Sequence, residues 1–138
     1  MPLKILFCVQ GEGRGHMTQA ISLAGLLRTA GHEVVATLVG NADGGDVPAF
    51  FRRRMQSPVI TFASPAIRLN EEARELDVGR TLMTGLGRLT DYASSLRRIS
   101  QTVADFAPDV VVNFYEPLTG VVKSRTNVFP PVVCIAHQ

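Results

Sequence analysis

The chain has 138 residues, of which 46% are hydrophobic and 19% are charged, which is enough for one sizeable core and a single globular domain over residues 1–138. Its 14 Lys and Arg residues against 12 Asp and Glu residues give a formal net charge of +2, which argues against nucleic acid as a partner. The sequence has no apolar run of the roughly 18 residues that a membrane span needs, and no secretory signal pattern, so we expect a cytoplasmic protein.

Five short apolar runs that are rich in β-branched residues predict strands. They cover residues 5–9, 34–39, 59–63, 110–112 and 132–136. Their apolar character is continuous rather than alternating, which is typical of parallel strands that helices cover on both faces. The two cysteines, Cys8 and Cys134, lie inside the first and last runs, which favours buried thiols in a reducing compartment over a disulfide.

In the segments between these runs, apolar residues recur at spacings of three and four, which is typical of helices. Residues 17–27 predict a helix that Gly31 can end, and residues 48–55 and 116–124 predict two short helices. A longer pattern over residues 82–106 predicts a helix that Pro108 stops. Two glycines weaken the first turns of this pattern, so the helix is expected to start several residues later; they are Gly85 and Gly87. Loops are expected over residues 40–47 and 64–79.

The alternation of strands and helices predicts an α/β fold, a doubly wound Rossmann-like parallel sheet with strand order 3-2-1-4-5. In this order the loops after strands one and four face each other at the carboxyl edge, where such sheets bind ligands. The sequence stops at Gln138, directly after an apolar strand with no helix to cover it. We therefore expect half of a larger protein, whose remainder follows in a longer chain or is a separate polypeptide.

The most informative motif joins the first predicted strand to the first helix and reads Gly11-Glu12-Gly13-Arg14-Gly15-His16. Its glycines allow positive φ, and the helix start presents unpaired N–H groups, so a phosphate or another oxygen-rich group is expected there. His16 stands where the dinucleotide fingerprint has its third glycine, no acidic residue ends the second strand, and the lysine of a Walker loop is absent. NAD, FAD and ATP chemistry are therefore disfavoured.

Two interpretations of His16 stay open. It either caps its helix or binds a neighbouring loop, or it is a neutral imidazole that acts as a base near pH 7, because a helix N-terminus disfavours the imidazolium. Across the predicted crevice, Tyr115 and Glu116 follow the fourth strand. Glu116 either orients His16 and ligand hydroxyls or caps the next helix. His137 follows the fifth strand at the same edge and is a further candidate, or a residue at the interface with the missing half.

At these residues the chain resembles the N-terminal domain of GT-B glycosyltransferases, in particular the MurG-like family 28. The matching segments lie in the same order along nearly the whole chain. They are residues 11–16, Thr18-Gln19-Ala20, Ala30-Gly31-His32-Glu33-Val34, Pro108-Asp109-Val110-Val111-Val112, Tyr115-Glu116-Pro117-Leu118 and His137-Gln138.

The resemblance implies an enzyme that transfers a sugar from a nucleotide sugar to an acceptor hydroxyl, between two Rossmann-like domains and without a metal or cofactor. This chain would be the acceptor-binding half, inactive alone, and a C-terminal donor domain would be absent from it. By position, the resemblance makes His16 the base or a residue that orients the acceptor hydroxyl, Gly13 and Gly15 the glycines of close approach, and Glu116 the second, acidic wall of the site. His16 and Glu116 are the candidate catalytic residues. The candidate substrate-binding residues are Gly13, Arg14, Gly15, Tyr115 and His137.

Two features bear on the acceptor. Glu12 and Arg14 stand where the MurG pattern has small residues, and Glu12 would repel a diphosphate-linked lipid unless Arg14 offsets its charge. Residues 50–55 combine two phenylalanines with three arginines. This segment is either a solvated helix whose phenylalanines face the core or a surface that contacts anionic lipid at the inner membrane face.

Two other functions stay open from the sequence. One is a non-catalytic module that binds phosphate or a nucleotide and docks on a partner. The other is one subunit of a two-chain glycosyltransferase whose donor half is a separate α/β protein. In either case the exposed edge after residue 138 would bind the partner, or a second copy of the chain in a homodimer.

Overall fold

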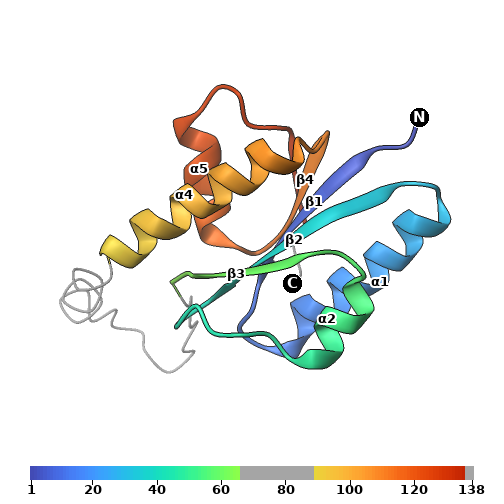
Figure 1. The fold of residues 1–138 in the computed structure, drawn as a ribbon, viewed down its shortest axis with the longest axis horizontal. Coiled ribbons are helices and arrows are strands. Elements are labelled where there is room, and N and C mark those ends of the chain that lie inside the picture. The colour runs from blue at the N-terminus through green and yellow to red at the C-terminus, as the bar shows by residue number, and fades with distance from the viewer. Residues whose placement is uncertain (66–88, 136–138) are drawn as a thin grey trace.

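The computed structural model describes residues 1–65 and 89–135 and contains one parallel sheet (Figure 1). Its five strands are hydrogen-bonded in the order β3-β2-β1-β4-β5, which confirms the predicted doubly wound order. All four pairings are parallel. The strand bounds are β1 (Lys4–Gln10), β2 (Glu33–Asn41), β3 (Val59–Ala63), β4 (Val110–Phe114) and β5 (Val132–Cys134).

Helices cover both faces of the sheet. Two of them, α1 (Arg14–Thr29) and α2 (Ala49–Met55), lie on one face, and α4 (Leu89–Phe106) and α5 (Pro117–Arg125) lie on the other (Figure 1). All four match predicted helices. The described part of the long helix begins at Leu89. Residues 82–88 of its apolar pattern and residues 66–79 of the predicted loop lie outside the described residues, so the expected later start of the helix stays a prediction.

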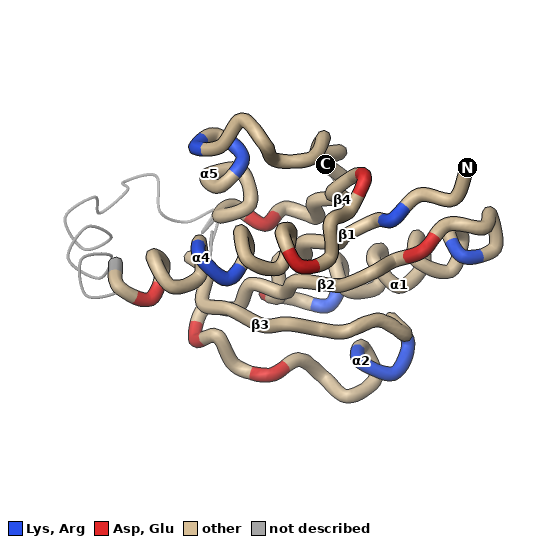
Figure 2. Tube along the Cα trace, turned by 45° about the horizontal axis from the view of Figure 1, so that its top comes forward, with Lys and Arg blue, Asp and Glu red and all other residues tan. Residues whose placement is uncertain are grey.

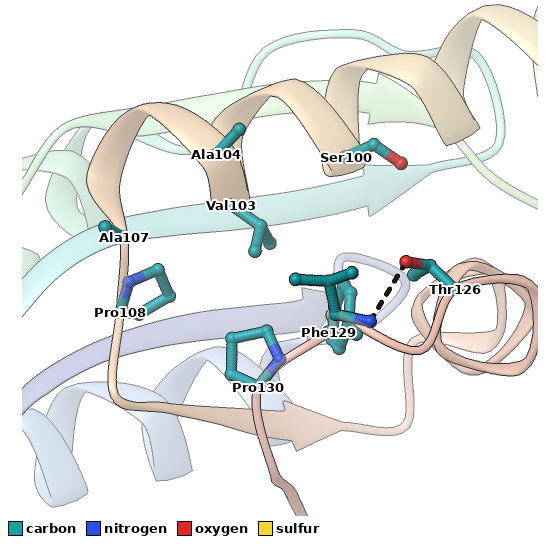
Figure 3. A pocket seen from close by; sticks show the side chains of 9 residues that line it. Ser100, Val103, Ala104, Ala107, Pro108, Thr126, Phe129 and Pro130 are labelled. Carbon is teal, nitrogen blue, oxygen red and sulfur yellow. Dashed lines mark hydrogen bonds between the residues drawn. The ribbon is translucent and has the colours of Figure 1, made fainter.

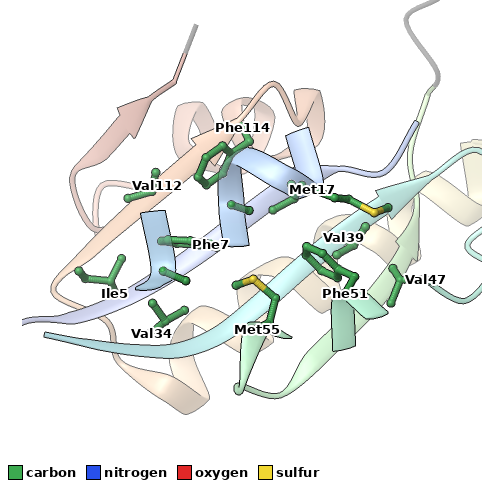
Figure 4. Packing of buried hydrophobic residues seen from close by; sticks show 13 residues of the cluster. Ile5, Phe7, Met17, Val34, Val39, Val47, Phe51, Met55, Val112 and Phe114 are labelled. Atoms are coloured by element: carbon green, nitrogen blue, oxygen red, sulfur yellow. The ribbon is translucent and has the colours of Figure 1, made fainter. Parts of the chain in front are cut away.

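The strand β1 divides its side chains between two apolar clusters, which explains its continuous apolar sequence. Ile5, Phe7 and Val9 pack with α1 and α2 (Figure 4). Leu6 and Cys8 belong to the cluster beneath α4 and α5. Because neighbouring residues of a strand point to opposite faces, a strand buried on both sides must be apolar at every position.

The short helix α2 supports the structural interpretation of the arginine-rich segment. Phe51 and Met55 are fully buried against α1 and the sheet (Figure 4). The three arginines between them are exposed, and Figure 2 shows α2 as a basic segment of the trace. The first of these, Arg52, binds Asp46 and the carbonyl of Val59. Contact of this segment with a membrane stays a prediction. In the described part of the chain, no helix has the length and apolar character needed to cross a bilayer.

The prediction that both cysteines are buried is correct for Cys8 and wrong for Cys134, which is exposed. The reason is the position of β5 at the edge of the sheet, where β4 is its one neighbouring strand among the described residues. An apolar run thus identified the strand but not its place in the sheet, and that place decides how much of each side chain is covered.

Candidate functional site

The predicted crevice is formed at the carboxyl ends of two neighbouring strands. Val9 of β1 is in register with Phe114 of β4, so the segments that follow these strands leave the sheet side by side. The rings of His16 and Tyr115 meet there, with centroids 5.4 Å apart and planes inclined at 32°. The prediction that the glycine loop and the segment after β4 face each other is therefore confirmed.

His16 is the third residue of α1 and is half-buried. Gly13 is the N-cap residue, with φ of 88°, and no side chain forms a capping hydrogen bond at this end of the helix. The next residue, Met17, is buried in the core and fixes the helix start against the sheet. The imidazole is thus held at the sheet edge by the fold and still reaches solvent.

Tyr115 adopts a backbone conformation that is uncommon for a residue with a side chain. Its φ is 61°, and its side chain is 49% exposed. Asn113 holds this turn from both sides: its Oδ1 accepts a hydrogen bond from the Glu116 N–H at 2.9 Å, and its Nδ2 donates to the Glu116 carbonyl at 3.0 Å. A left-handed conformation costs about 1 kcal/mol or more outside glycine, so the surrounding contacts must maintain it.

Glu116 is the N-cap of α5 and is 1% exposed. Its carboxylate accepts hydrogen bonds from the N–H of Leu118 at 3.2 Å and from both the N–H and the hydroxyl of Thr119 at 2.8 Å. The hydroxyl of Ser64 is a fourth donor. Glu116 therefore caps α5, as one of its two interpretations predicts. The ring that contacts His16 is that of Tyr115. A catalytic role for Glu116 stays a prediction.

Sequence reasoning missed the group of residues that surrounds Glu116. Ser64 directly follows β3 and is 2% exposed. A Cβ on Gly40 would lie 3.0 Å from the Glu116 carboxylate. On the other side lies Cys8, whose pKa rises to about 12, mainly through burial; a hydrogen bond with Thr119 lowers it and the Glu116 charge raises it. No sequence motif marks Ser64, whereas a glycine at the end of a buried strand could have indicated a close approach at Gly40.

The glycine loop is fastened to the end of β2. The N–H of Gly11 donates to the carbonyl of Gly40 at 2.8 Å, and the Glu12 carboxylate accepts from the N–H of Ala42 at 3.1 Å. A Cβ at Gly11 would lie 1.8 Å from Asn41 Oδ1, so a side chain at this position would displace Asn41 or the loop. Three predicted substrate-binding residues of the loop are exposed at the sheet edge, namely Gly13, Arg14 and Gly15.

A hollow of about 450 Å³ opens beside the loop, between the ends of β1 and β2. Three carboxylates, those of Glu12, Asp43 and Asp46, and the guanidinium of Arg14 are in its lining. A hydrogen bond from Arg52 lowers the pKa of Asp46, so this carboxylate is charged near neutral pH. Because Arg52 pairs with Asp46, the other charged groups of the lining are the carboxylates of Glu12 and Asp43 and the guanidinium of Arg14.

A second hollow, of about 350 Å³, lies at the carboxyl ends of β4 and β5. Tyr115 lines it together with residues of α5 and β5. Since β1 and β4 lie between β2 and β5 in the sheet, the His16–Tyr115 pair separates the two hollows along one edge. The two hollows and the ring pair together form the candidate site.

A further hollow of about 470 Å³ lies away from this edge (Figure 3). It is lined by Val103, Pro108 and Pro130, among others, and these prolines precede β4 and β5. Parallel sheets of this kind bind ligands at the opposite, carboxyl edge. This hollow contains none of the predicted site residues.

Two predictions about the site are not tested by the structure. His137 lies outside the described residues. Within residues 1–65 and 89–135, no three His, Cys, Asp or Glu side chains form a group that could hold a metal ion. Metal independence stays a prediction.

Comparisons with known proteins agree with the fold and with the resemblance. The family model described as Glycosyl transferase family 1 matches residues 3–138. The chain is 33% identical over 116 residues to the UDP-N-acetylglucosamine–N-acetylmuramyl-(pentapeptide) pyrophosphoryl-undecaprenol N-acetylglucosamine transferase of Chlorobium luteolum, covering 80% of this chain and 28% of that protein. It is 27% identical to an uncharacterized glycosyltransferase of Methanosarcina mazei, covering 99% of this chain and 33% of that protein.

Solved structures show the same fold. The calicheamicin glycosyltransferase CalG4 matches with a TM-score of 0.58 and 18% identity over 97% of this chain and 32% of that one. The glycosyltransferase of kitacinnamycin matches with a TM-score of 0.57 and 16% identity over 96% of this chain and 30% of that one. The chain thus spans about a third of the length of these proteins. Because the family model matches nearly all of its residues, the chain belongs to glycosyl transferase family 1.

Proposed function

We propose that this chain is the acceptor-binding part of a glycosyltransferase that moves a sugar from a nucleotide sugar to an acceptor hydroxyl. The observation that carries the proposal is the His16–Tyr115 pair at the carboxyl edge of the sheet, between two hollows. Family membership and the likeness to the Chlorobium transferase support sugar transfer as the reaction class.

In the proposed reaction the acceptor oxygen attacks the anomeric carbon of the donor sugar. The new carbon–oxygen bond forms as the bond between that carbon and the diphosphate breaks, and the nucleoside diphosphate leaves with the electron pair. His16 takes the proton of the attacking hydroxyl. A half-buried imidazole with access to solvent suits this role, because it can bind the hydroxyl and later release the proton to water.

Tyr115 and Glu116 have supporting roles in this proposal. Tyr115 restricts the orientation of the imidazole through the ring contact, and its exposed part forms a wall for the acceptor. Glu116 positions Tyr115, since it caps α5 and is tied to Asn113 on both sides of its own backbone. We propose that the substrates approach the backbone of the glycine loop closely at Gly13 and Gly15. Both glycines are exposed, and the space where a Cβ would stand is open at each of them.

Most contacts to the nucleotide sugar are assigned to a second domain or subunit that faces this edge of the sheet. The matched relatives are about three times as long as the aligned segment, which supports such a partner. We propose that the chain is inactive without it and that the reaction needs no metal ion. The enzyme would act in the cytoplasm, where nucleotide sugars are made available to it, with an acceptor that is either free or membrane-bound.

The proposal is tested with the complete protein and a panel of uridine and thymidine diphosphate sugars, following release of the nucleoside diphosphate with and without added acceptor alcohols. We expect release that depends on the acceptor and survives a chelator. The isolated 138-residue chain is the matched negative control. Binding of nucleotide sugars to the complete protein without any transfer, over the whole panel, would favour a non-catalytic binding module instead.

A further inference from the structure

The hydroxyl of Ser64 connects two segments that are far apart in the sheet order. Ser64 directly follows β3, and its hydroxyl donates a hydrogen bond to the carboxylate of Glu116, which directly precedes α5. In the sheet, β2 and β1 lie between β3 and β4. The bond therefore joins the end of β3 to the segment after β4, which carries Tyr115.

The glycine near the end of β2 leaves the space that this contact occupies. A Cβ at Gly40 would lie 2.8 Å from the Cβ of Ser64 and 3.0 Å from a carboxylate oxygen of Glu116. Ser64 is itself buried and is held by the sheet, because its N–H donates to the carbonyl of Asn41 at 2.8 Å. Ser64 is thus a fixed point to which the carboxylate is attached.

The other donors to this carboxylate belong to the helix that it caps. They are the N–H of Leu118 and the N–H and hydroxyl of Thr119, and both residues would move with Glu116 if the start of α5 shifted. Cys8 of β1 contacts Thr119, but a thiol is a weak hydrogen-bonding group. Among the described residues, Ser64 is the donor to the carboxylate that lies outside α5.

The position of Glu116 determines the turn at Tyr115, because the two residues are adjacent. Tyr115 has a φ of 61°, which residues with a side chain seldom adopt, so the residue after it must be held firmly. Asn113 binds the backbone of Glu116, and Ser64 binds its carboxylate. Apolar packing of α5 has no preferred direction, whereas these hydrogen bonds have one.

We propose that Ser64 is a positioning residue for the transfer reaction: through Glu116, its hydroxyl keeps the Tyr115 ring against His16. The inference rests on the proposed function and adds to it a buried residue that contacts no substrate. Placement matters because a shift of about 1 Å can lower the rate of a catalysed step by roughly 100-fold. Loss of the hydroxyl lowers kcat, and the KM for the donor stays unchanged because most donor contacts are assigned to the second domain.

The first test compares Ser64→Ala with Ser95→Ala in the complete protein. Ser95 is the matched control, because it is also a buried serine and its hydroxyl donates to the carbonyl of Ala63, directly beside Ser64, at 2.6 Å. We expect kcat to fall by roughly 10- to 100-fold in Ser64→Ala and by less than about twofold in Ser95→Ala, with the donor KM unchanged in both. Similar kcat values for the two variants would overturn the proposal.

A conservative variant separates the hydrogen bond from the packing of the side chain. Ser64→Cys keeps a side chain of similar shape, but its thiol is a weak donor. We expect its kcat to lie between those of the wild type and of Ser64→Ala. If Ser64→Ala does not fold, Ser64→Cys takes its place in the comparison with Ser95→Ala. A kcat at or below that of Ser64→Ala would assign the effect to packing and overturn the proposal.

The second test determines whether Ser64 acts through the ring of Tyr115. Tyr115→Gly removes the ring, so no ring is left for Ser64 to position. In this background we expect Ser64→Ala to lower kcat by less than about twofold, in contrast to its effect on the wild type. Effects that multiply in the double variant would show that Ser64 acts elsewhere and would overturn the proposal.

A readout that does not need turnover is the NMR signal of the His16 Cε1–H in the complete protein, which His16→Ala identifies. The nearby Tyr115 ring shifts this signal. We expect Ser64→Ala to move it toward its position in Tyr115→Gly and Ser95→Ala to leave it in place. An unmoved signal in Ser64→Ala contradicts this inference alone. Absence of transfer by the wild type with every donor and acceptor contradicts the proposed function, and the signal then still tests the link from Ser64 to Tyr115.

Discussion

The imidazole of His16 and the phenol ring of Tyr115 lie with their centroids 5.4 Å apart, one at the start of α1 and the other directly after β4. The pairing of β1 with β4 brings them together at the carboxyl edge of the sheet. Neither residue reaches this position through a local motif alone. The strand order creates the site, and the two turns supply its chemistry.

Two substitutions of Tyr115 separate the effect of its ring from the effect of its backbone conformation. Tyr115→Gly removes the ring and its contacts, which destabilises the protein. Glycine adopts the φ of 61° without strain, and this offsets the loss by roughly 1 kcal/mol. We expect the melting temperature of this variant to stay within a few degrees of that of the wild type while transfer falls at least tenfold. Tyr115→Phe keeps the ring, and its turnover should remain within a few fold. Equal activity of the Gly and Phe variants would show that the ring has no role.

Glu116 is expected to matter for stability. Glu116→Ala removes the cap of α5 and leaves the buried hydroxyls of Ser64 and Thr119 without their acceptor, at a cost of roughly 2 to 4 kcal/mol. Glu33→Ala is the control, because Glu33 is exposed at the start of β2 and should change stability by less than about 0.5 kcal/mol. Urea unfolding of both variants measures the difference, and similar midpoints would refute the structural role of Glu116.

The fold as a whole follows from features that the sequence displays. Continuous apolar strands alternating with amphipathic helices predict the doubly wound order, and the order in turn predicts that the glycine loop faces the segment after β4. Both predictions are confirmed. They succeed because burial on both faces of a sheet constrains every position of its inner strands.

The details around Glu116 could not be predicted in the same way. Its bond to Ser64 joins residues 52 positions apart, and it depends on where the chain leaves β3 rather than on residue type. The left-handed residue of the turn is Tyr115 itself, which is neither a glycine nor an asparagine, so its residue type does not indicate this conformation. The exposure of Cys134 depends on the place of β5 at the sheet edge, which its apolar sequence does not reveal.

A side chain at Gly11 is predicted to destabilise the protein. In Gly11→Ala the new Cβ would lie 1.8 Å from Asn41 Oδ1 and 2.9 Å from a Val39 methyl group, so the loop must shift, at a cost of about 1 to 3 kcal/mol. Gly15→Ala meets no atom within 4 Å and replaces a helix glycine, so it should stabilise the protein by up to about 1 kcal/mol. Thermal unfolding of the two variants distinguishes these effects, and a shift of the same sign in both would contradict the prediction.

The two cysteines should differ in their response to pH. Burial raises the pKa of Cys8 from 9.0 to about 12, and the thiolate is the reactive form, so iodoacetamide should leave Cys8 unmodified in the folded protein near pH 9 while it labels the exposed Cys134. The Cys8 thiol ionises at a lower pH in the unfolded chain than in the folded protein. Its contribution to stability is therefore constant below about pH 9.0 and is lost as the pH rises toward about 12. Labelling of Cys8 and Cys134 at equal rates near pH 9 would disprove its burial.

In the proposed reaction, the imidazole of His16 accepts the proton of the acceptor hydroxyl. The most direct test of this step is the turnover rate of His16→Ala in the complete protein at saturating donor and acceptor, with His32→Ala as the control, because His32 lies at the other end of α1 and contacts the backbone N–H of Leu3. We expect a loss of roughly 100- to 10,000-fold in turnover for His16→Ala and little change for His32→Ala. An unchanged turnover rate in His16→Ala would contradict it.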